Sequence, residues 1–439
     1  MAITIKSASP LHTHFFSPLL TRLAQLKSFR SCPKLSDADW LQIGIGRTLE
    51  SVRSGRDFLQ SMQSKLRLPD VSHFFATLKS KRRLALCTEA NTALCATLTD
   101  TVPDVFAAYP ALAGFDLYAA DGHAHAAAAH DVPQPSKTGF TKFATSHIYA
   151  LNLRTHGMSH LALADQITRR KEHEMRTLKR LTIVQLRQGA PAGRKVLYIY
   201  DPACLDYTLW HQLKKQAIYF LTRMKSNAAL TQCGDLAYTA TDPLNAGVHF
   251  DRQVGIAGRM VRQVRYQCPK SGEIFDFLTN EMKIPPGLIA RLYQMRWDIE
   301  KSYDEIKNKL NEPERSGDSQ PETYPCCWQK KAWASSATAK AMQATFICLA
   351  HNLMVQQEHR LLVDEQVSNT SEIKRKAARL GDAMAILTSK NEVMPVLQQV
   401  FQRHTQRSVK YLRWLRAWLY LEAPWQDVVA KLRESYRVV

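Results

Sequence analysis

The pattern of apolar and polar positions divides the chain into a helical beginning and a mixed α/β middle. Up to about residue 110, apolar residues recur at helical spacing, which predicts a helical N-terminal domain over 1–110. The segments with this spacing are 19–29, 38–52 and 73–98. From residue 115 the pattern changes to short apolar runs. FDLYAAD (115–121) and VLYIYD (196–201) are typical of strands buried in a central sheet, and each ends in an aspartate.

Hairpin, helix and strand patterns alternate between and after these two strands. A hairpin is predicted over 147–165 and a charged helix over 167–188, and a second helix and strand follow over 205–216 and 217–225. The complete order is strand, hairpin, helix, strand, helix, strand, which is the order that an α/β ribonuclease-H-like core requires. Open α/β sheets bind ligands at the carboxyl ends of their strands, where both aspartates lie.

The rest of the chain contains two further strand patterns and several helical ones. Segments 260–268 and 273–280 alternate like the strands of a hairpin, and Pro285 and Pro286 then begin a helix. The polar, proline-containing segment 311–325 predicts a loop. A helix is expected from there to about residue 358, and a helical C-terminal region over 359–439.

The helix after Pro286 carries the most informative pattern of the chain, LYQMRWDIEKSYDEIKNKL (292–310). An apolar stripe that should be buried consists of Leu292, Met295, Ile299, Ile306 and Leu310. Beside it, within an arc of roughly 60° at helical spacing, lie Tyr293, Arg296, Glu300 and Lys307. A carboxylate flanked by two cations and a phenol can hold a metal ion and bind phosphates, so this face is expected to open onto a cleft.

The spacing Y-x2-R-x3-E-x6-K closely resembles the signature of bacterial insertion-sequence transposases of the DDE type, the YREK subgroup. The resemblance implies a ribonuclease-H-like DDE catalytic domain over 111–358, with a β-rich insertion at about 226–280. It also implies that Asp121, Asp201 and Glu300 are the catalytic acids and bind two Mg²⁺ (or Mn²⁺) ions in each active site. The remaining signature residues, Tyr293, Arg296 and Lys307, are then expected to bind DNA phosphates.

The chain departs from the family pattern beside both aspartates. The family usually has Gly and then Ser or Thr after the first acid, whereas here Gly122 and His123 follow Asp121. The second acid is followed by Pro-Ala-Cys in place of the usual Arg-Gly-aromatic. Asp206 is therefore a rival for the second acid, and Asp201 is preferred because a buried strand fixes its position more firmly.

Several other residues have two interpretations at this level. Trp297 could stack on a displaced base, as aromatic residues do in related transposases that form a DNA hairpin, or could lie at a helix–core boundary. The basic cluster Lys79, Lys81, Arg82 and Arg83 could bind DNA or form the solvated face of a helical bundle. The tryptophan-rich segment 407–432 could contact DNA or a second subunit, or could form a core helix pair. His123, His125 and His130 are expected to line the cleft or face solvent, because imidazole does not suit Mg²⁺.

Composition narrows the class of partner. The 439 residues include 59 Lys and Arg against 39 Asp and Glu, a formal net charge of +20, which favours a polyanionic partner such as nucleic acid. The nine cysteines have irregular spacing without metal-ligand pairs, which favours a reduced, intracellular protein without a structural zinc site. No apolar run is long enough to span a membrane, and the N-terminus does not resemble a signal peptide.

The leading hypothesis from the sequence is a cut-and-paste DNA transposase of the bacterial cytoplasm, associated with the nucleoid. It would bind the terminal inverted repeats of its own element as a homodimer, cleave DNA strands and transfer them to target DNA by in-line phosphoryl transfer. Its partners would be double-stranded element ends and double-stranded target DNA, with no membrane involved. Two alternatives stay open: a catalytically inactive, transposase-derived DNA-binding protein, and a metal-dependent nuclease without strand transfer.

Overall fold

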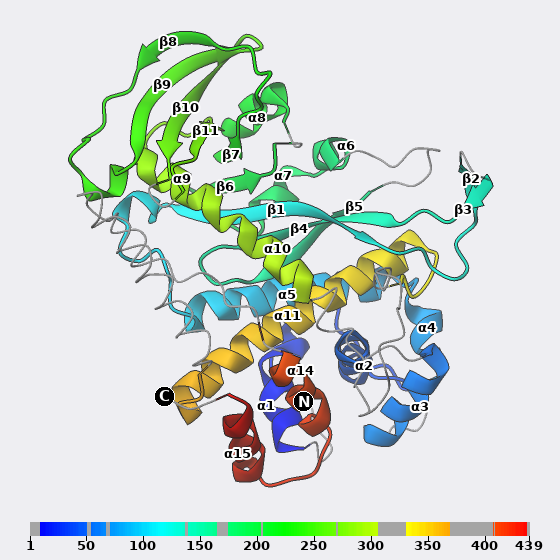
Figure 1. The fold of residues 1–439 in the computed structure, drawn as a ribbon. Coiled ribbons are helices and arrows are strands. Elements are labelled where there is room, and N and C mark those ends of the chain that lie inside the picture. The colour runs from blue at the N-terminus through cyan, green and yellow to red at the C-terminus, as the bar shows by residue number, and fades with distance from the viewer. Residues whose placement is uncertain are drawn as a thin grey trace, which may run out of the picture.

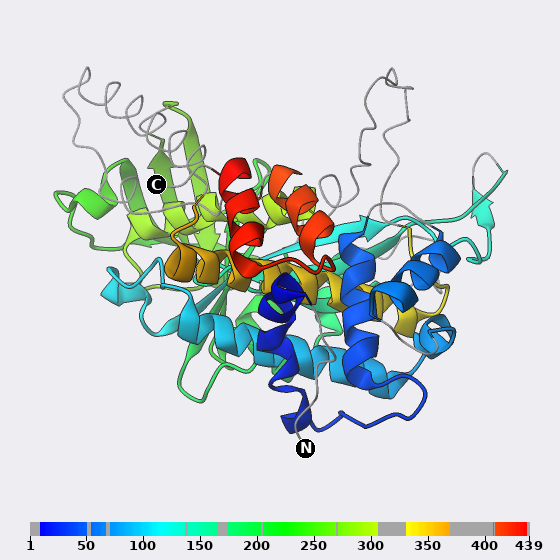
Figure 2. The same cartoon turned by 90° about the horizontal axis from the view of Figure 1, so that it is seen from below.

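A mixed nine-stranded sheet lies at the centre of the described part of the protein (Figure 1). The computed structural model describes residues 9–50, 54–66, 71–136, 139–164, 174–202, 205–268, 271–305, 331–368, 407 and 409–436. The strand order in the sheet is β5-β4-β1-β6-β7-β11-β10-β9-β8. Helices from both ends of the chain gather on one side of the sheet (Figures 1 and 2). The mixed α/β class expected from the sequence is confirmed, and the arrangement is consistent with a ribonuclease-H-like transposase fold.

The first five strands of the core follow the predicted order. They are β1 (Phe115–His125), β4 (Thr145–Asn152), β5 (Met158–Leu163), β6 (Lys195–Tyr200) and β7 (Ile218–Arg223). β1, β4 and β5 pair antiparallel, whereas β1, β6 and β7 pair in parallel. The parallel strands are buried on both faces, which explains why they have no polar alternation in the sequence.

Four strands after residue 226 extend the same sheet. They are β8 (Thr231–Asp235), β9 (Val248–Ile256), β10 (Arg259–Gln267) and β11 (Ile274–Thr279). β11 pairs antiparallel with β7, from Phe277↔Arg223 to Thr279↔Leu221, so the segment between them is attached to the core without a break in the sheet. A separate small hairpin consists of β2 (Gln134–Ser136) and β3 (Gly139–Thr141).

Helices cover both faces of the sheet. The first face packs against residues of α5 (Lys81–Thr101), α9 (Pro286–Met295), α10 (Trp297–Asp304) and α11 (Ala337–Glu365). The opposite face packs against α6 (Glu174–Lys179), α7 (Ile183–Arg187) and α8 (Tyr207–Lys214). Along β1 and β6, alternate side chains point to these two faces: Leu117 and Ile199 belong to the first core, Tyr118 and Tyr198 to the second.

The remaining helices pack around α11. They are α1 (Pro10–Leu20), α2 (Asp37–Leu49), α3 (Gly55–Lys65), α4 (His73–Thr77), α14 (Val409–Trp418) and α15 (Trp425–Ser435). The C-terminal pair lies beside α1 (Figure 2). Trp414 is buried and Trp425 stacks on the ring of His14, so these tryptophans belong to the core. In the described part of the chain, no helix has the length and apolarity needed to cross a membrane.

Helix boundaries are where the sequence predictions were wrong. The first helix covers Pro10–Leu20 instead of 19–29, because Ser9 caps it and Pro10 occupies its first turn. The predicted helix over 73–98 is interrupted, since the Ser80 hydroxyl accepts the Arg83 N–H and starts α5 as a new helix. In place of one helix over 167–188 there are α6 and α7, of which α7 begins at a Thr182 capping box; residues 165–173 lie outside the described range.

Candidate active site

Asp121 and Asp201 occupy equivalent positions on neighbouring strands. The parallel register of β1 and β6 ends at Ala119↔Ile199, and each aspartate lies two residues further on. With a side-chain period of two, both therefore point to the face that holds Leu117 and Ile199, and adjacent strands are about 4.8 Å apart. β6 ends at Tyr200, immediately before Asp201, as predicted.

Asp121, by contrast, lies within its strand and does not end it. β1 was expected to stop at residue 120, but it continues to His125 because β4 still pairs with it there, with Asp121 opposite Tyr149. Asp121 is thus fixed by a backbone partner on the β4 side and lies beyond the last parallel pair on the β6 side. Its Oδ1 also accepts the N–H of Gly122 at 2.8 Å.

The signature helix is divided in two at Arg296. α9 ends at Met295, α10 begins at Trp297, and the Arg296 N–H bonds to the Tyr293 carbonyl three residues earlier. The apolar stripe is buried where it is described, because Leu292, Met295 and Ile299 are at most 1% exposed. Ile306, Leu310 and Lys307 lie outside the described residues.

Arg296 brings the acids together. Its Nη2 lies 2.7 Å from Glu300 Oε1 and 4.0 Å from Asp201 Oδ2, and its Nη1 lies 3.8 Å from Asp121 Oδ2. The side chain was expected to be open to the cleft, yet Arg296 is only 5% exposed. Burial by itself would lower the pKa of the guanidinium, but Glu300, Tyr293 and Asp121 outweigh burial and raise that pKa. The guanidinium therefore offsets one of the three negative charges of Asp121, Asp201 and Glu300.

Tyr293 lies on the same side of the helix pair. It is 9% exposed, its ring packs 5.0 Å from that of Phe277, and the Arg296 guanidinium carbon lies 5.8 Å from its ring centroid. Burial raises the pKa of the Tyr293 phenol, and the nearby Arg296 only partly opposes this effect. The phenol is therefore protonated at neutral pH and can donate a hydrogen bond to a phosphate oxygen.

A pocket of about 480 Å³ opens beside the acids, between α9 and the strands after residue 226. Its lining includes Asp201, Arg296 and Trp297, together with Arg223 and Phe275. Trp297 is 54% exposed, so its ring is not packed into the core. An exposed indole next to buried charge is the arrangement that a stacking residue requires.

The donor chemistry of the three acids suits a hard divalent cation, since carboxylate oxygens are the ligands that Mg²⁺ and Mn²⁺ prefer. Their side chains are 21%, 43% and 32% exposed for Asp121, Asp201 and Glu300, which leaves oxygen atoms accessible. Among the described residues, however, no three His, Cys, Asp or Glu side chains converge as a preassembled metal site. The carboxylates surround Arg296, so binding a metal requires the guanidinium to withdraw.

Comparison with known proteins places part of the chain among transposases. Residues 121–320 match the family model described as "Transposase DDE domain", and the match starts at Asp121 itself. Residues 121–320 are thus similar to a transposase DDE domain. A segment of 119 residues is also 28% identical to "Putative transposase y4zB" of Sinorhizobium fredii (strain NBRC 101917 / NGR234). That segment spans 26% of this chain and 33% of the relative. Both similarities support an insertion-sequence transposase of the DDE type, whereas the YREK subgroup stays a prediction.

Asp206, the rival second acid, has a structural role. Its Oδ1 accepts the Leu209 N–H at 2.9 Å as the N-cap of α8, and its Oδ2 pairs with Lys179. These contacts hold the carboxylate at a helix start. Asp201 is within 4.0 Å of the guanidinium that also contacts Glu300, so the geometry favours Asp201 as the second acid.

Tyr303 is a residue of the site that the sequence interpretation missed. Its hydroxyl donates to the backbone carbonyl of Asp121 at 2.8 Å, and its ring stacks on His123 at 4.8 Å. It thus ties α10 directly to the strand that carries the first acid. Its position three residues after Glu300, on a neighbouring part of the helix surface, was the available signal.

The histidines after Asp121, which were expected to line the cleft or face solvent, lie in different environments. His130 is exposed, but His125 is 2% exposed and its Nε2 lies 3.0 Å from the Tyr149 hydroxyl on β4. His147 of β4 packs 4.3 Å from the His125 ring. The antiparallel pairing of β1 with β4 creates this cluster, which no local pattern of the sequence reveals.

The four N-terminal cations separate into two pairs. Arg82 donates to both carboxylate oxygens of Asp37, and Arg83, which is 5% exposed, lies 3.3 Å from Asp37 and over the Trp40 ring. Both guanidiniums therefore serve packing between α2 and α5. Lys79 and Lys81 are exposed and remain candidates for DNA binding.

Proposed function

We propose that this protein is a cut-and-paste transposase that binds the terminal inverted repeats of its element, cleaves DNA strands and transfers them to a target. The observation that carries the proposal is the gathering of Asp121, Asp201 and Glu300 around Arg296, beside a pocket with an exposed tryptophan. These acids come from two strands and a helix, which allows them to surround one phosphate group.

The proposed metal ligands are Asp121, Asp201 and Glu300, which would hold Mg²⁺ or Mn²⁺, two ions in each active site. Bound there, the ions would activate the attacking oxygen and neutralise charge on the phosphoryl group. Arg296 would leave the acids and engage the phosphate, to which a guanidinium can donate two hydrogen bonds. Tyr293 would donate a further hydrogen bond, and Lys307 is proposed to bind phosphate as well.

The reaction consists of two in-line displacements at phosphorus. In the first, a water oxygen bonds to phosphorus while the bond to the 3′ oxygen breaks, which leaves a 3′-hydroxyl and a 5′-phosphate. In the second, that 3′-hydroxyl attacks a target phosphate and displaces another 3′ oxygen, so the number of phosphodiester bonds is conserved. The ring of Trp297, 54% exposed at the pocket, would stack on an unpaired base at the element end.

The proposed partners are double-stranded element ends and target DNA, with two copies of the chain in the synaptic complex at the bacterial nucleoid. The formal net charge of +20 supports a polyanionic partner. Incubation of the protein with Mg²⁺ and a linear fragment bearing the ends of its own element tests the proposal. Cuts at the ends, and joined products when target DNA is added, are the expected result. Cuts without joined products would indicate a nuclease, and DNA binding without cuts a catalytically inactive relative.

Arg296→Lys is expected to lower the rate of end cleavage about 10- to 100-fold, because lysine keeps the charge but loses the planar two-point contact. Single-turnover cleavage at saturating protein measures this effect. Arg265→Lys is the matched control, because Arg265 also contacts a carboxylate, that of Asp276 on the neighbouring strand, but lies outside the acid cluster. Equal rates for the two variants would argue that Arg296 only balances charge.

The N-terminal cations are expected to respond in two different ways. Lys79→Glu combined with Lys81→Glu should weaken binding to DNA, with unchanged stability. The log–log salt slope should fall by about 0.9 for each phosphate that these lysines neutralise in the wild-type protein. Arg83→Ala should instead lower the free energy of unfolding by about 1–3 kcal/mol, because it removes the donor to the buried Leu35 carbonyl and one of the two cations that contact Asp37. Anisotropy titrations across salt concentrations and urea unfolding separate these effects. A salt-independent affinity would mean that the net charge serves solubility.

A further inference from the structure

The side of α10 opposite Glu300 carries buried charges that the proposed chemistry does not use. Asp298 is 0% exposed and Glu305, at the C-cap of the helix, is 1% exposed. Residues seven apart on a helix lie within about 20° of each other, so these two carboxylates share one side. Glu300 is about 200° from Asp298 and therefore faces away from both. α10 thus has an acidic side toward β1 and a second, buried acidic side.

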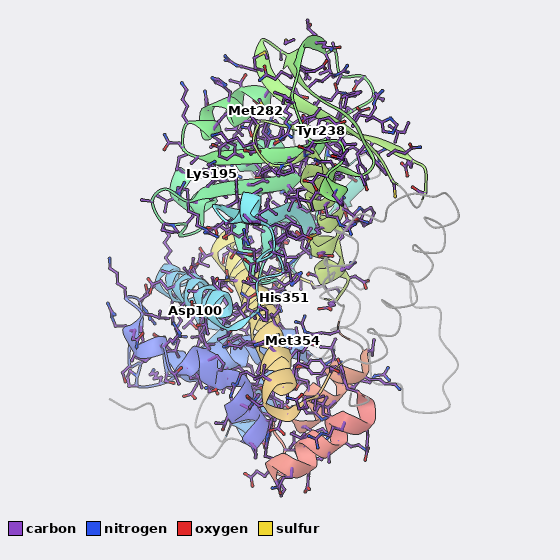
Figure 3. All side chains as sticks on the ribbon, turned by 90° about the vertical axis from the view of Figure 1, so that its left-hand side faces the viewer. Asp100, Lys195, Tyr238, Met282, His351 and Met354 are labelled. Carbon is purple, nitrogen blue, oxygen red and sulfur yellow. The ribbon has the colours of Figure 1, made fainter. Side chains whose placement is uncertain are left out.

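That second side is held by α11 at two levels. At the first, Asp298 Oδ2 lies 3.6 Å from Nε2 of His156, and the His156 carbonyl accepts a hydrogen bond from His351 Nε2 at 2.9 Å. His351 lies on α11, in the middle of the molecule (Figure 3). The turn that carries His156 follows β4, so this level links the helix to the sheet as well.

The second level is a buried triad centred on Arg407. Its Nη1 lies 2.9 Å from Glu305 Oε2 and its Nε lies 2.9 Å from Glu358 Oε2, and its backbone N–H bonds to Glu305 Oε1. Arg407 is 1% exposed. Glu358 lies seven residues after His351 on α11, as Glu305 does after Asp298 on α10. On both helices, therefore, the residues of the two levels are seven positions apart.

The ion pair of Arg407 with Glu305 adds a polar restraint on α10 to its apolar contacts and to the Tyr303 hydrogen bond. Charge-assisted hydrogen bonds are directional, and a planar guanidinium that contacts two carboxylates restricts where each of them can lie. Displacement of a catalytic group by about 1 Å can cost about 100-fold in rate. Arg407 comes from the C-terminal region, 102 residues after Glu305, and is followed at once by α14.

We propose that Arg407 is a positioning residue that fixes the rotation of α10, and with it the Glu300 carboxylate, so that the C-terminal region is required for cleavage. The claim that Arg407 positions Glu300 for cleavage rests on the proposed transposase function. The claim that Arg407 restrains α10 does not. Arg407 contacts neither the three proposed metal ligands nor the pocket beside them. Its effect passes from Glu305 along α10 to Glu300.

Arg407→Lys tests the proposal in the full chain, with Arg433→Lys on the exposed side of α15 as matched control. Lysine keeps the charge but cannot bridge both carboxylates. The expected result is an approximately 10- to 100-fold lower single-turnover rate of end cleavage, with the apparent Kd for the element ends within about twofold of wild type. Hydrogen exchange should accelerate in the amides of α10 but not in those of β6. Unchanged exchange in α10 together with an unchanged rate would overturn the proposal.

A triple variant, Glu305→Gln with Arg407→Met and Glu358→Gln, separates positioning from stability. Removing all three charges avoids an unpaired buried ion, and glutamine at position 305 keeps an oxygen for the Arg407 backbone N–H. The expected protein cleaves slowly even if it unfolds at the wild-type urea concentration. Wild-type cleavage by this variant would show that the triad is only structural. If the wild-type chain itself does not cleave, the proposed function fails, and the exchange of α10 in Arg407→Lys still decides whether Arg407 holds the helix.

Discussion

Asp121→Asn, Asp201→Asn and Glu300→Gln are each expected to lower the rate of end cleavage on the order of 10³-fold and to leave DNA-end binding equal or tighter. An amide has nearly the shape of a carboxylate, but it is neutral and a weaker ligand for a divalent ion. Removing a negative charge beside the phosphate also reduces repulsion, which is why binding should not weaken. Single-turnover cleavage at fixed Mg²⁺ and an anisotropy titration of the ends measure the two quantities.

Asp206→Asn is the control for these variants. Asparagine caps a helix as well as aspartate does, so the start of α8 should be preserved and cleavage should stay near the wild-type rate. Loss of cleavage in Asp206→Asn together with normal cleavage in Asp201→Asn would transfer the role of second acid to Asp206. Normal cleavage in all three main variants would remove the carboxylate cluster from the mechanism.

His12 and His351 together are expected to remove roughly 4 kcal/mol of the free energy of unfolding when the pH falls from 7 to 5, a large part of the 5–15 kcal/mol typical of proteins. Burial lowers the pKa of His12 to about 4 and that of His351 to about 3, and it lowers the pKa of His147 well below the usual 6.5. All three imidazoles are at most 2% exposed. Each lowered pKa means a neutral ring in the folded state and a ring that takes up a proton near pH 6.5 in the unfolded state.

The direction in which stability changes with pH follows from this difference in protonation. The contribution of each histidine is complete above pH 6.5 and is lost as the pH falls toward the folded-state pKa, at about 1.4 kcal/mol per pH unit. Urea unfolding at pH 7 and pH 5 measures the loss. His12→Phe should reduce it by about 2 kcal/mol, because phenylalanine can occupy the ring site between Phe16 and Tyr420 without titrating. His130→Phe, at an exposed position, should leave the loss unchanged, and equal stability at both pH values would contradict the expectation.

Much of the fold could be predicted because the core strands carry their own signal. β6 and β7 are continuous apolar runs, and such runs indicate strands that helices cover on both faces. Helix limits failed where a short capping signal interrupts the periodicity, as at Ser80 and Thr182. A capping hydroxyl contributes about 1 kcal/mol, which is enough to end one helix and begin another even where the apolar spacing continues.

The sequence predicted which residue types form the site, but it predicted their arrangement less completely. The spacing of Tyr293, Arg296 and Glu300 indicated one helix face, and two strand-end aspartates indicated the edge of the sheet. The sequence did not indicate that the helix divides at Arg296. It also did not indicate that the guanidinium lies among the acids instead of in an open cleft. The position of the guanidinium depends in part on Asp121 and Asp201, which come from strands distant in the chain.

The sequence by itself determined the order of core strands and helices along the chain, the helical start of the chain and the chemical type of the acid cluster, because periodicity and motif spacing are local properties. Only the tertiary structure decided which charges are buried and which are exposed. Arg83 and Lys81 are near neighbours in the same basic run, yet one is buried on Trp40 and the other is exposed. Arg407 had no local signal at all, since its partners Glu305 and Glu358 meet it only through packing. Burial turns such a cation from a solvated charge into a fixed structural contact, and burial is a property of the whole fold.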